Sequence, residues 1–261
     1  MSKNNEILFE VKRDFATRFA AEHYLSNGYG SHFHRNVEIY GVADGEVTVS
    51  IAGEKRILTK GQIGVINCME IHEYFAQRQA DIFYLHIGTA YLSAFVSLYK
   101  RSLLPRWLLD TEYNKKLYDQ IKNVIDAGDD LSELKKYGIT SNLLADIVDH
   151  YGVVPGGYDN KVHEFVERVI QYIYEHYAED ITLKKLAEVF CIEPKFLSSK
   201  LIKYIGTDIR LFVSDIRYAK ALQLMTDSNY RDKTKTEIAA LCGFKSYRSF
   251  YEACKRNSIA F

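Results

Sequence analysis

The chain has 261 residues, of which 47% are hydrophobic and 26% are charged, and its formal net charge at pH 7 is zero. This composition is typical of a soluble globular protein with one large or two modest domains. No apolar run approaches the roughly 20 residues needed to cross a membrane, and residues 1–15 lack the apolar core of a secretory signal, so we expect a cytoplasmic protein.

Residues 30–90 show the pattern of β-structure. Apolar and polar residues alternate over residues 47–51, as expected for a half-buried strand. Asp44-Gly45 stands between two apolar runs and predicts a β-hairpin. Residues 81–88 predict a further strand. Several short strands at this spacing are typical of a sandwich or a barrel.

Residues 89–150 show three stretches with the apolar spacing of helices. Two apolar stripes in them predict either the contact of a homodimer or packing on the barrel: Leu117, Ile121, Val124 and Ile125, and Leu143, Leu144, Ile147 and Val148. Residues 151–160 follow and contain Pro155-Gly156-Gly157, so we interpret them as a linker.

Residues 161–261 predict an all-helical domain. This segment holds 17 Lys and Arg against 13 Asp and Glu, a weak indication of an anionic partner. Thr182 is expected to cap one helix, and Pro194 suits the first turn of the next. Residues 208–226 predict a longer helix, and Thr234 with Glu237 forms a capping-box pattern.

An internal repeat stands out in this domain: residues 186–201 and 238–254 follow one plan. Each begins with a large aliphatic residue and an alanine, turns, and starts a second helix with one buried residue, Leu197 or Phe250. Gly243 can adopt the left-handed conformation that the turn needs. The second copy is one residue longer in its turn. This is the helix-turn-helix plan, in which the second helix can enter the DNA major groove.

The exposed face of each second helix is the predicted DNA-binding surface. Its residues are Lys195, Ser198, Ser199, Ile202 and Lys203 in the first copy, and Tyr247, Arg248, Tyr251, Glu252, Lys255 and Arg256 in the second. Lys203 and Arg256 are expected to reach phosphates, which position a protein on DNA without reading sequence. The alternative interpretation is two ordinary helical hairpins.

Residues 162–256 resemble the AraC family of bacterial transcription regulators. The resemblance rests on ITLKKLAEVF, the helix start at Pro194, IRYAKALQLM and EIAALCGFKSYRSFYEACKR. It implies two helix-turn-helix units that dock in successive segments of the major groove on one face of DNA. Ser199 and Glu252 stand where family members often carry Arg, and Glu193 stands where Ser or Thr usually caps the helix.

The N-terminal part resembles the small cupin-like barrel that precedes the DNA-binding domain in AraC-like regulators. His32, His34 and Glu38 have the spacing of the first cupin motif. Residues 61–72 resemble the second motif, with His72 as its histidine. This implies a pocket for a small polar effector such as a sugar, lined by His32, His34, Glu38, Tyr40, His72, Tyr24, Tyr84 and His86.

A metal ion is the alternative occupant of this barrel. In metal-dependent cupins three histidines and one glutamate converge on a first-row metal, and residues two apart on a strand share a face. His32, His34, Glu38 and His72 could therefore bind one. Regulators of this family often keep similar histidines and bind no metal, so we expect neither a metal nor another cofactor. A purely structural role for these residues is a third interpretation.

The sequence thus predicts an α+β protein: a cupin-like effector-binding and dimerisation domain at 1–150, a linker at 151–160, and an AraC-type DNA-binding domain at 161–261. The predicted function is regulation of transcription, with double-stranded DNA and a small molecule as partners, no membrane association and no catalysis. One alternative is a metal-dependent cupin enzyme with a helical partner domain. Another is a regulator that responds to a protein instead of a small molecule.

Overall fold

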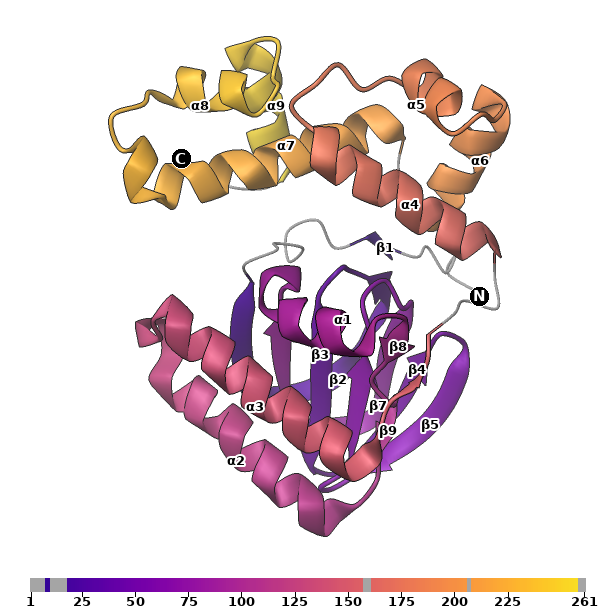
Figure 1. Ribbon diagram of the computed structural model, residues 1–261, viewed down its shortest axis with the longest axis vertical. Helices are drawn as coiled ribbons and strands as arrows, with labels where there is room; N and C mark the ends of the chain where they lie inside the picture. The colour runs from indigo at the N-terminus through magenta and orange to yellow at the C-terminus, as the bar shows by residue number, and fades with distance from the viewer. Residues whose placement is uncertain (1–7, 10–17, 157–160, 206–207, 258–261) are drawn as a thin grey trace. The chain divides into compact units, whose positions relative to one another are not determined.

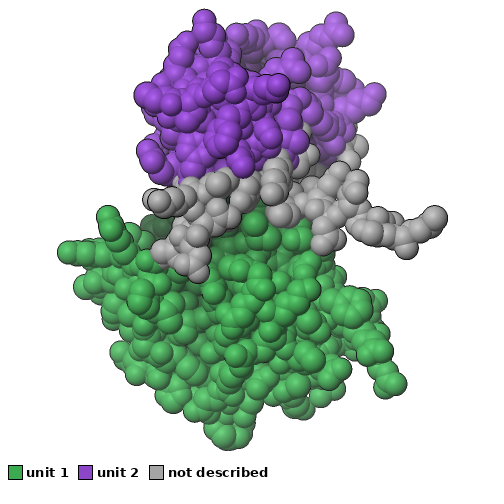
Figure 2. All heavy atoms as spheres, turned by 90° about the vertical axis from the view of Figure 1, so that its right-hand side faces the viewer, with its two compact units in different colours: residues 1–5, 13–157 green, residues 6–12, 158–261 purple. Residues whose placement is uncertain are grey.

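The computed structural model describes residues 8–9, 18–156, 161–205 and 208–257 (Figure 1). The chain forms two compact units, coloured separately in Figure 2: residues 1–5 with 13–157, and residues 6–12 with 158–261. The first unit is a curled antiparallel sheet with helices, and the described part of the second is helical apart from β1 (Leu8–Phe9). This architecture confirms the predicted α+β class. None of the described helices has the length and apolarity that a membrane-spanning segment requires.

Strand β7 (His72–Ile87) organises the sheet of the first unit. It pairs along its length with β2 (Phe19–Phe33), and its C-terminal part pairs with β3 (Val37–Asp44). Its N-terminal end pairs with β4 (Glu46–Ile51). β3 also pairs with β6 (Ile63–Ile66), and β6 in turn pairs with β9 (Trp107–Leu108). Strands far apart in the sequence therefore meet around β7, and they curl the sheet around a buried interior.

The predicted β-hairpin at Asp44-Gly45 is wrong. Gly45 has a φ of +87° and does turn the chain, but β3 and β4 pair with different parts of β7 and not with each other. The hairpin lies one turn later, between β4 and β5 (Glu54–Thr59), where Ala52 and Gly53 have φ values of 50° and 86°. Two successive positive φ angles are typical of the type I′ turn, whose twist matches that of paired strands.

Two long helices of the first unit lie beside each other against the sheet (Figure 1): α2 (Thr111–Ala127) and α3 (Glu133–Tyr151). The side chain of Asp110 caps α2, and that of Ser132 caps α3. The shorter elements of this unit are η2 (Thr89–Leu92), α1 (Ser93–Tyr99), β8 (Ser102–Leu103), η3 (Gly128–Asp130) and β10 (Val154–Pro155).

The two apolar stripes of these helices pack inside the unit. Leu117, Ile121, Leu143 and Ile147 are fully buried in one core with residues of the sheet such as Phe83. The remaining members of the stripes, Val124, Leu144, Ile125 and Val148, join the same core. Of the two alternatives that the stripes left open, their burial supports packing on the barrel, and the homodimer stays a prediction. Burying one such side chain stabilises the folded unit by about 1.5–3 kcal/mol.

Part of the predicted linker at 151–160 is structured. Helix α3 ends at Tyr151, and β10 pairs with β8, with Val154 opposite Leu103. Gly156 lies so close to Arg101 that an added Cβ would be 1.9 Å from its carbonyl oxygen, so glycine is needed there. Residues 157–160 lie outside the described residues.

The second unit consists of helices arranged as two short pairs and two longer helices. The longer helices are α4 (Lys161–His176) and α7 (Ile209–Thr226). The pairs are α5 (Leu183–Val189) with α6 (Pro194–Ile205), and α8 (Lys235–Leu241) with α9 (Tyr247–Arg256). A short η4 (Ser228–Tyr230) follows α7. In Figure 1 the two pairs lie towards opposite ends of α7.

The helix starts in this unit follow the sequence signals. The Thr182 hydroxyl accepts a hydrogen bond from the Lys185 amide, and Pro194 is the first residue of α6. Thr234 and Glu237 form the predicted capping box, in which each side chain bonds the other's backbone amide. Each such cap satisfies amides that the first turn leaves without partners, which contributes about 1 kcal/mol.

Candidate functional site

The two short helix pairs share one turn geometry. The Ile192 amide donates to the Ala187 carbonyl at 3.0 Å, and the Phe244 amide donates to the Ala239 carbonyl, also at 3.0 Å. This bond across six residues belongs to the Schellman motif, which ends a helix at a residue with left-handed conformation. Gly243 holds that position in the second pair with a φ of +85°, as predicted. The repeat found in the sequence is thus a structural repeat.

The second helix of each pair begins with a side-chain cap. The Glu193 carboxylate accepts a hydrogen bond from the Phe196 amide at 2.9 Å, so it does the work of the Ser or Thr usual at this place. Ser246 accepts from the Ser249 amide at 3.2 Å at the start of α9. Gly243 precedes its cap by three residues, and Cys191 precedes Glu193 by two, so the second turn is one residue longer, as predicted.

On α6 and α9 most of the predicted DNA-binding residues are exposed and the predicted anchor residues are buried, as expected of recognition helices. Leu197 and Phe250 are buried beneath α6 and α9. The exposed residues among those predicted are Lys195, Ser199, Ile202, Tyr247, Arg248, Tyr251, Glu252, Lys255 and Arg256. Ser198 is half-buried, and the side chain of Lys203 lies outside the described residues. Their contact with DNA stays a prediction.

Two arginines on α9 have acidic partners within the unit. The Nε of Arg248 lies 3.1 Å from the Glu252 carboxylate, one helical turn away, and both side chains are exposed. The Nη2 of Arg256 lies 2.6 Å from the Asp215 carboxylate of α7. Arg256 therefore ties α9 to α7, and a phosphate contact by this residue would compete with that ion pair.

A buried polar cluster occupies the interior of the curled sheet in the first unit. His32, His34, Glu38, His72 and His86 are each at most 3% exposed. Strand β2 supplies His32, and His34 follows its end; β3 supplies Glu38, and β7 supplies the other two. The structure therefore brings these five residues together, and their contact with an effector stays a prediction.

The Glu38 carboxylate is the centre of this cluster. Its Oε2 atom lies 3.1 Å from Nε2 of His34, 3.4 Å from Nε2 of His72 and 3.0 Å from Nε2 of His86. Its Oε1 atom accepts a hydrogen bond from the Tyr74 hydroxyl at 2.9 Å. A single carboxylate thus contacts four side chains in a site closed to solvent.

Burial and the neighbouring groups change the acidity of the cluster. Burial, with His72 nearby, lowers the pKa of His32 to about 2, so this ring is neutral. Burial alone would raise the pKa of Glu38, but the neighbouring His86 and the hydrogen bond with His34 hold it well below its usual range. Burial and the negative charge of Glu38 raise the pKa of Tyr74, which keeps its proton. The cluster therefore holds the Glu38 carboxylate beside the neutral ring of His32 and the protonated hydroxyl of Tyr74.

Aromatic rings extend the cluster. The rings of Tyr40 and Tyr74 stack with their centroids 4.0 Å apart. The ring centroids of Tyr84 and His86 lie 4.7 Å apart. Tyr40 and Tyr84 are buried, as expected of lining residues, whereas Tyr24 is 43% exposed and touches Tyr84 from the edge of the site. The predicted effector-binding set is thus one buried group with a single partly exposed member.

Two residues that bond the cluster were missed from the sequence. Tyr74 is two residues after His72 on β7, so the alternation of strand faces would have found it. Arg18 donates its Nε–H to Nδ1 of His86 at 3.1 Å and lies just before β2. No local pattern identified Arg18, because its contact spans 68 residues of sequence.

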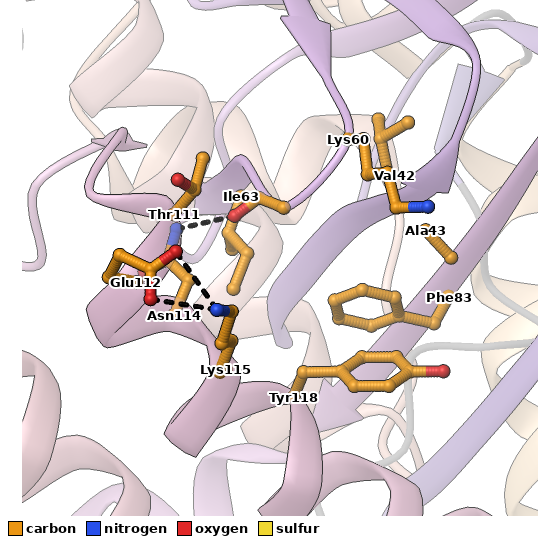
Figure 3. Close-up of a pocket in the computed structure, with 11 residues that line it drawn as sticks. Val42, Ala43, Lys60, Ile63, Phe83, Thr111, Glu112, Asn114, Lys115 and Tyr118 are labelled. Carbon is orange, nitrogen blue, oxygen red and sulfur yellow. Dashed lines mark hydrogen bonds and ion pairs between the residues drawn. The ribbon is translucent and has the colours of Figure 1, made fainter.

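A separate cavity of about 360 Å³ lies between the sheet and α2 (Figure 3). Phe83, Ile63 and Tyr118 supply apolar walls, and Lys60 and Lys115 lie at its border. Lys115 is paired with Glu112 at 2.7 Å. None of the predicted effector-binding residues lines this cavity, so it is a second place where a small molecule could bind.

Comparison with known proteins gives a family match for the N-terminal part. Residues 15–95 match the family described as AraC-like ligand binding domain. An uncharacterized HTH-type transcriptional regulator of Staphylococcus aureus (strain MSSA476) is 26% identical over 225 residues, which cover 82% of this chain and 29% of that protein. YobQ of Bacillus subtilis (strain 168), with the same description, is 32% identical over 81 residues, or 31% of this chain and 32% of that protein. The chain therefore spans about 29% of the length of the staphylococcal relative.

Two solved structures are also similar to this chain. A structure of apo ToxT from Vibrio cholerae is 13% identical and covers 94% of this chain and 95% of its own, with a TM-score of 0.49. The AraC-like transcriptional activator CuxR is 10% identical and covers 86% and 82%, with a TM-score of 0.46. The family match, together with the descriptions of the relatives, confirms the resemblance to AraC-type regulators.

Proposed function

We propose that this chain, whose residues 15–95 match the AraC-like ligand binding domain family, is a sequence-specific DNA-binding regulator of transcription controlled by a small molecule. The observation that carries the proposal is the repeated helix pair of the second unit. Each pair has the same turn, a buried anchor in its second helix, and exposed polar and aromatic residues on that helix. A helix presented in this way can enter the major groove.

The effector is proposed to bind within the first unit and to be a small polar molecule, with a carbohydrate as the first class to test. Imidazole, carboxylate and phenol groups in the buried cluster can exchange hydrogen bonds with hydroxyl groups, and the aromatic rings beside them offer flat apolar contacts. The effector controls DNA binding only if it binds the DNA-competent arrangement of the protein more tightly than the other arrangement. We further propose that the protein acts as a cytoplasmic homodimer.

A metal-dependent cupin enzyme is the second candidate function. The observation that favours it is the group of His32, His34, Glu38 and His72, whose ligand atoms all lie within 4.8 Å of one another. We favour the regulator because the relatives are described as transcriptional regulators and because the helix pairs would have no role in catalysis.

Selection from random double-stranded DNA by the purified protein, with and without a carbohydrate mixture, tests the proposed function. We expect an enriched sequence whose affinity falls steeply with salt, since phosphate contacts release counterions. The variant Lys195→Ala with Lys255→Ala removes two exposed cations from α6 and α9 and is expected to bind the same sequence more weakly, with a salt slope reduced by about 2. Lys136→Ala in the first unit is the control. No enriched sequence, or a flat salt response, would contradict DNA recognition.

A further inference from the structure

The cavity between the sheet and α2 lies where β3 carries small residues. One row of directly paired residues faces the helices from four strands: His23, Phe83, Gly41 and Ile63. The Phe83 ring lies across Gly41, because a Cβ added to Gly41 would be 2.0 Å from that ring. Ala43, two residues later on the same face of β3, is also small and packs against the core beneath the helices. The low floor under α2 leaves the cavity of about 360 Å³.

The wall that α2 supplies to this cavity is held in place. Asn114 is 1% exposed, and its Nδ2 donates to the carbonyl oxygens of Gly61 and Leu108, both at 2.8 Å. Its Oδ1 accepts a hydrogen bond from the Tyr151 hydroxyl at 2.7 Å. Gly61 has a φ of +82°, and a Cβ there would be 3.1 Å from the Thr111 side chain, so the two sides of the cavity approach closely at this point. The pocket is therefore preformed, which lowers the free-energy cost of binding a ligand.

The interior of the cavity suits an aromatic ring. Ile63, Phe83 and Tyr118 form its apolar walls (Figure 3). The ring centroids of Phe83 and Tyr118 lie 4.7 Å apart and their planes are inclined by 59°, so a further ring can pack against a face or an edge. An apolar cavity of about 150 Å³ can hold a benzene molecule. A cavity of about 360 Å³ thus has room for about two rings with a short side chain.

The border of the cavity carries the charges. Lys60 and Lys115 are its cations, and Glu112 is the acidic group among its described lining residues. The two lysine side chains are 75% and 69% exposed, and each has a surface ion pair, Lys60 with Asp44 and Lys115 with Glu112. Such exposed pairs contribute little stability, so a ligand anion can share both ammonium groups. Lysine stems lie along apolar surface while the ammonium stays in water, which places the positive charge at the mouth.

We propose that this cavity binds a small aromatic carboxylate. Its ring packs against Phe83 and Tyr118, and its carboxylate stays at the mouth beside Lys60 and Lys115. A single negative charge suits the site better than a phosphate, because Glu112 repels a more highly charged group.

This site is separate from the buried polar cluster. Gly41 faces α2, whereas Glu38 and Tyr40 on the same strand point to the opposite face of the sheet and belong to the curled interior. The inference therefore goes beyond the proposed function, and it depends neither on DNA binding nor on an effector in the interior.

The test is a titration of the full chain with three probes that share one ring system and differ in charge: indole-3-acetate, indole-3-acetamide and tryptamine. Calorimetry and the line widths of the probe's NMR signals follow binding. We expect indole-3-acetate to bind saturably with a Kd of about 1 mM or tighter, as a ligand of this size can. The neutral amide should bind about 5- to 10-fold more weakly and the cationic amine more weakly still, because neither is attracted by the lysines.

Charge variants assign the mouth of the site. The double variant Lys60→Gln with Lys115→Gln is expected to bind the acid and the amide with affinities equal within about 2-fold. Lys136→Gln is the matched control and should keep the preference for the acid. Lys136 pairs with Glu133 three residues before it on α3, as Lys115 pairs with Glu112 on α2.

A filled cavity assigns its interior. Ala43→Phe places a ring in the space beneath α2 and is expected to weaken binding of both the acid and the amide by about 10-fold or more. Its melting temperature and circular dichroism report whether it folds. If it does not fold, the variants of the exposed lysines still assign the site.

Three results would overturn the proposal. The first is no saturable binding of indole-3-acetate by the unchanged protein up to about 10 mM, ten times the expected Kd. The second is a preference for the acid that survives the loss of both lysines. The third is unchanged binding in a folded Ala43→Phe variant, which would place the probe elsewhere. None of these results bears on the helix pairs, so a failed cavity site and a failed regulator are distinguished.

Discussion

Cys191 and Gly243 hold the same place in two equivalent turns, and both have a left-handed backbone, with φ values of 52° and 85°. Glycine adopts this conformation freely, whereas any other residue pays for it with a close approach between Cβ and the backbone. The first turn therefore contains strain that the second avoids.

Replacing Cys191 by glycine is expected to stabilise the protein. Glycine relieves the left-handed strain of the folded state, but its greater freedom in the unfolded chain offsets part of this gain. The net free energy of unfolding should rise by about 0.5–1 kcal/mol. Urea denaturation measures this difference. Cys191→Ala is the control, because alanine keeps the strain and should give no gain. Equal stability of the glycine and alanine variants would show that the turn is unstrained.

Replacing Gly243 by alanine is expected to destabilise the protein by about 2 kcal/mol or more. A Cβ at this position would lie 2.6 Å from the Ala178 carbonyl oxygen, in addition to the left-handed strain. The melting temperature should fall accordingly. Gly138→Ala in α3 is the control: nothing lies within 4 Å of its added Cβ, so this variant should gain up to about 1 kcal/mol of helix propensity. A Gly243→Ala protein as stable as the unchanged one would contradict the turn geometry.

Replacing Glu252 by glutamine is expected to tighten DNA binding several-fold at low salt and to steepen its salt dependence. The change removes a negative charge from α9 and releases Arg248, whose exposed ion pair with Glu252 contributes under about 1 kcal/mol. Fluorescence anisotropy with the selected DNA measures both effects. Glu175→Gln in α4 is a control that removes the same charge from a different helix. Unchanged or weaker binding by Glu252→Gln would show that this face of α9 does not approach DNA.

The cysteines are expected to differ in reactivity. Burial raises the pKa of the Cys242 thiol to about 11 and also raises that of Cys254, while Cys191 is exposed. Only the thiolate is a nucleophile. In the folded protein at pH 8, iodoacetamide should therefore modify Cys191 first and leave Cys242 and Cys254 unmodified until denaturant is added. Mass spectrometry of the digested protein follows each thiol. Early modification of Cys242 would mean that the second helix pair opens in solution.

Local signals in the sequence predicted the second unit well. The capping box at Thr234 and the helix start at Pro194 act within one turn of a helix, so they depend little on distant residues. Gly243 indicated the left-handed position of the second turn, whereas no signal indicated the same conformation at Cys191 in the first turn. Ion pairs such as Arg256 with Asp215 join different helices, and no local pattern could identify them.

The first unit shows where such signals fail. Asp44-Gly45 correctly marks a turn, but strand partners are chosen by contacts with β7 that lie far along the chain. The stripe through Leu117 and Ile121 predicted burial, yet periodicity does not say which surface covers a helix. The spacing of His32, His34 and Glu38 indicated that these residues could converge. The carbonyl groups that contact Nδ1 of His32 and His34 are positioned only by the folded backbone.

Strand β7 has a consequence for the order of events in folding. It carries His72, Tyr74 and His86, while Glu38 arrives on β3 and His32 on β2, so the cluster is complete only after pairings that span tens of residues have formed. Contacts of such long range are slow to form, because the chain must first close large loops. A molecule that binds the cluster would therefore bind only late on the folding pathway. It would lengthen the lifetime of the native state by slowing unfolding, and it would leave the rate of folding almost unchanged.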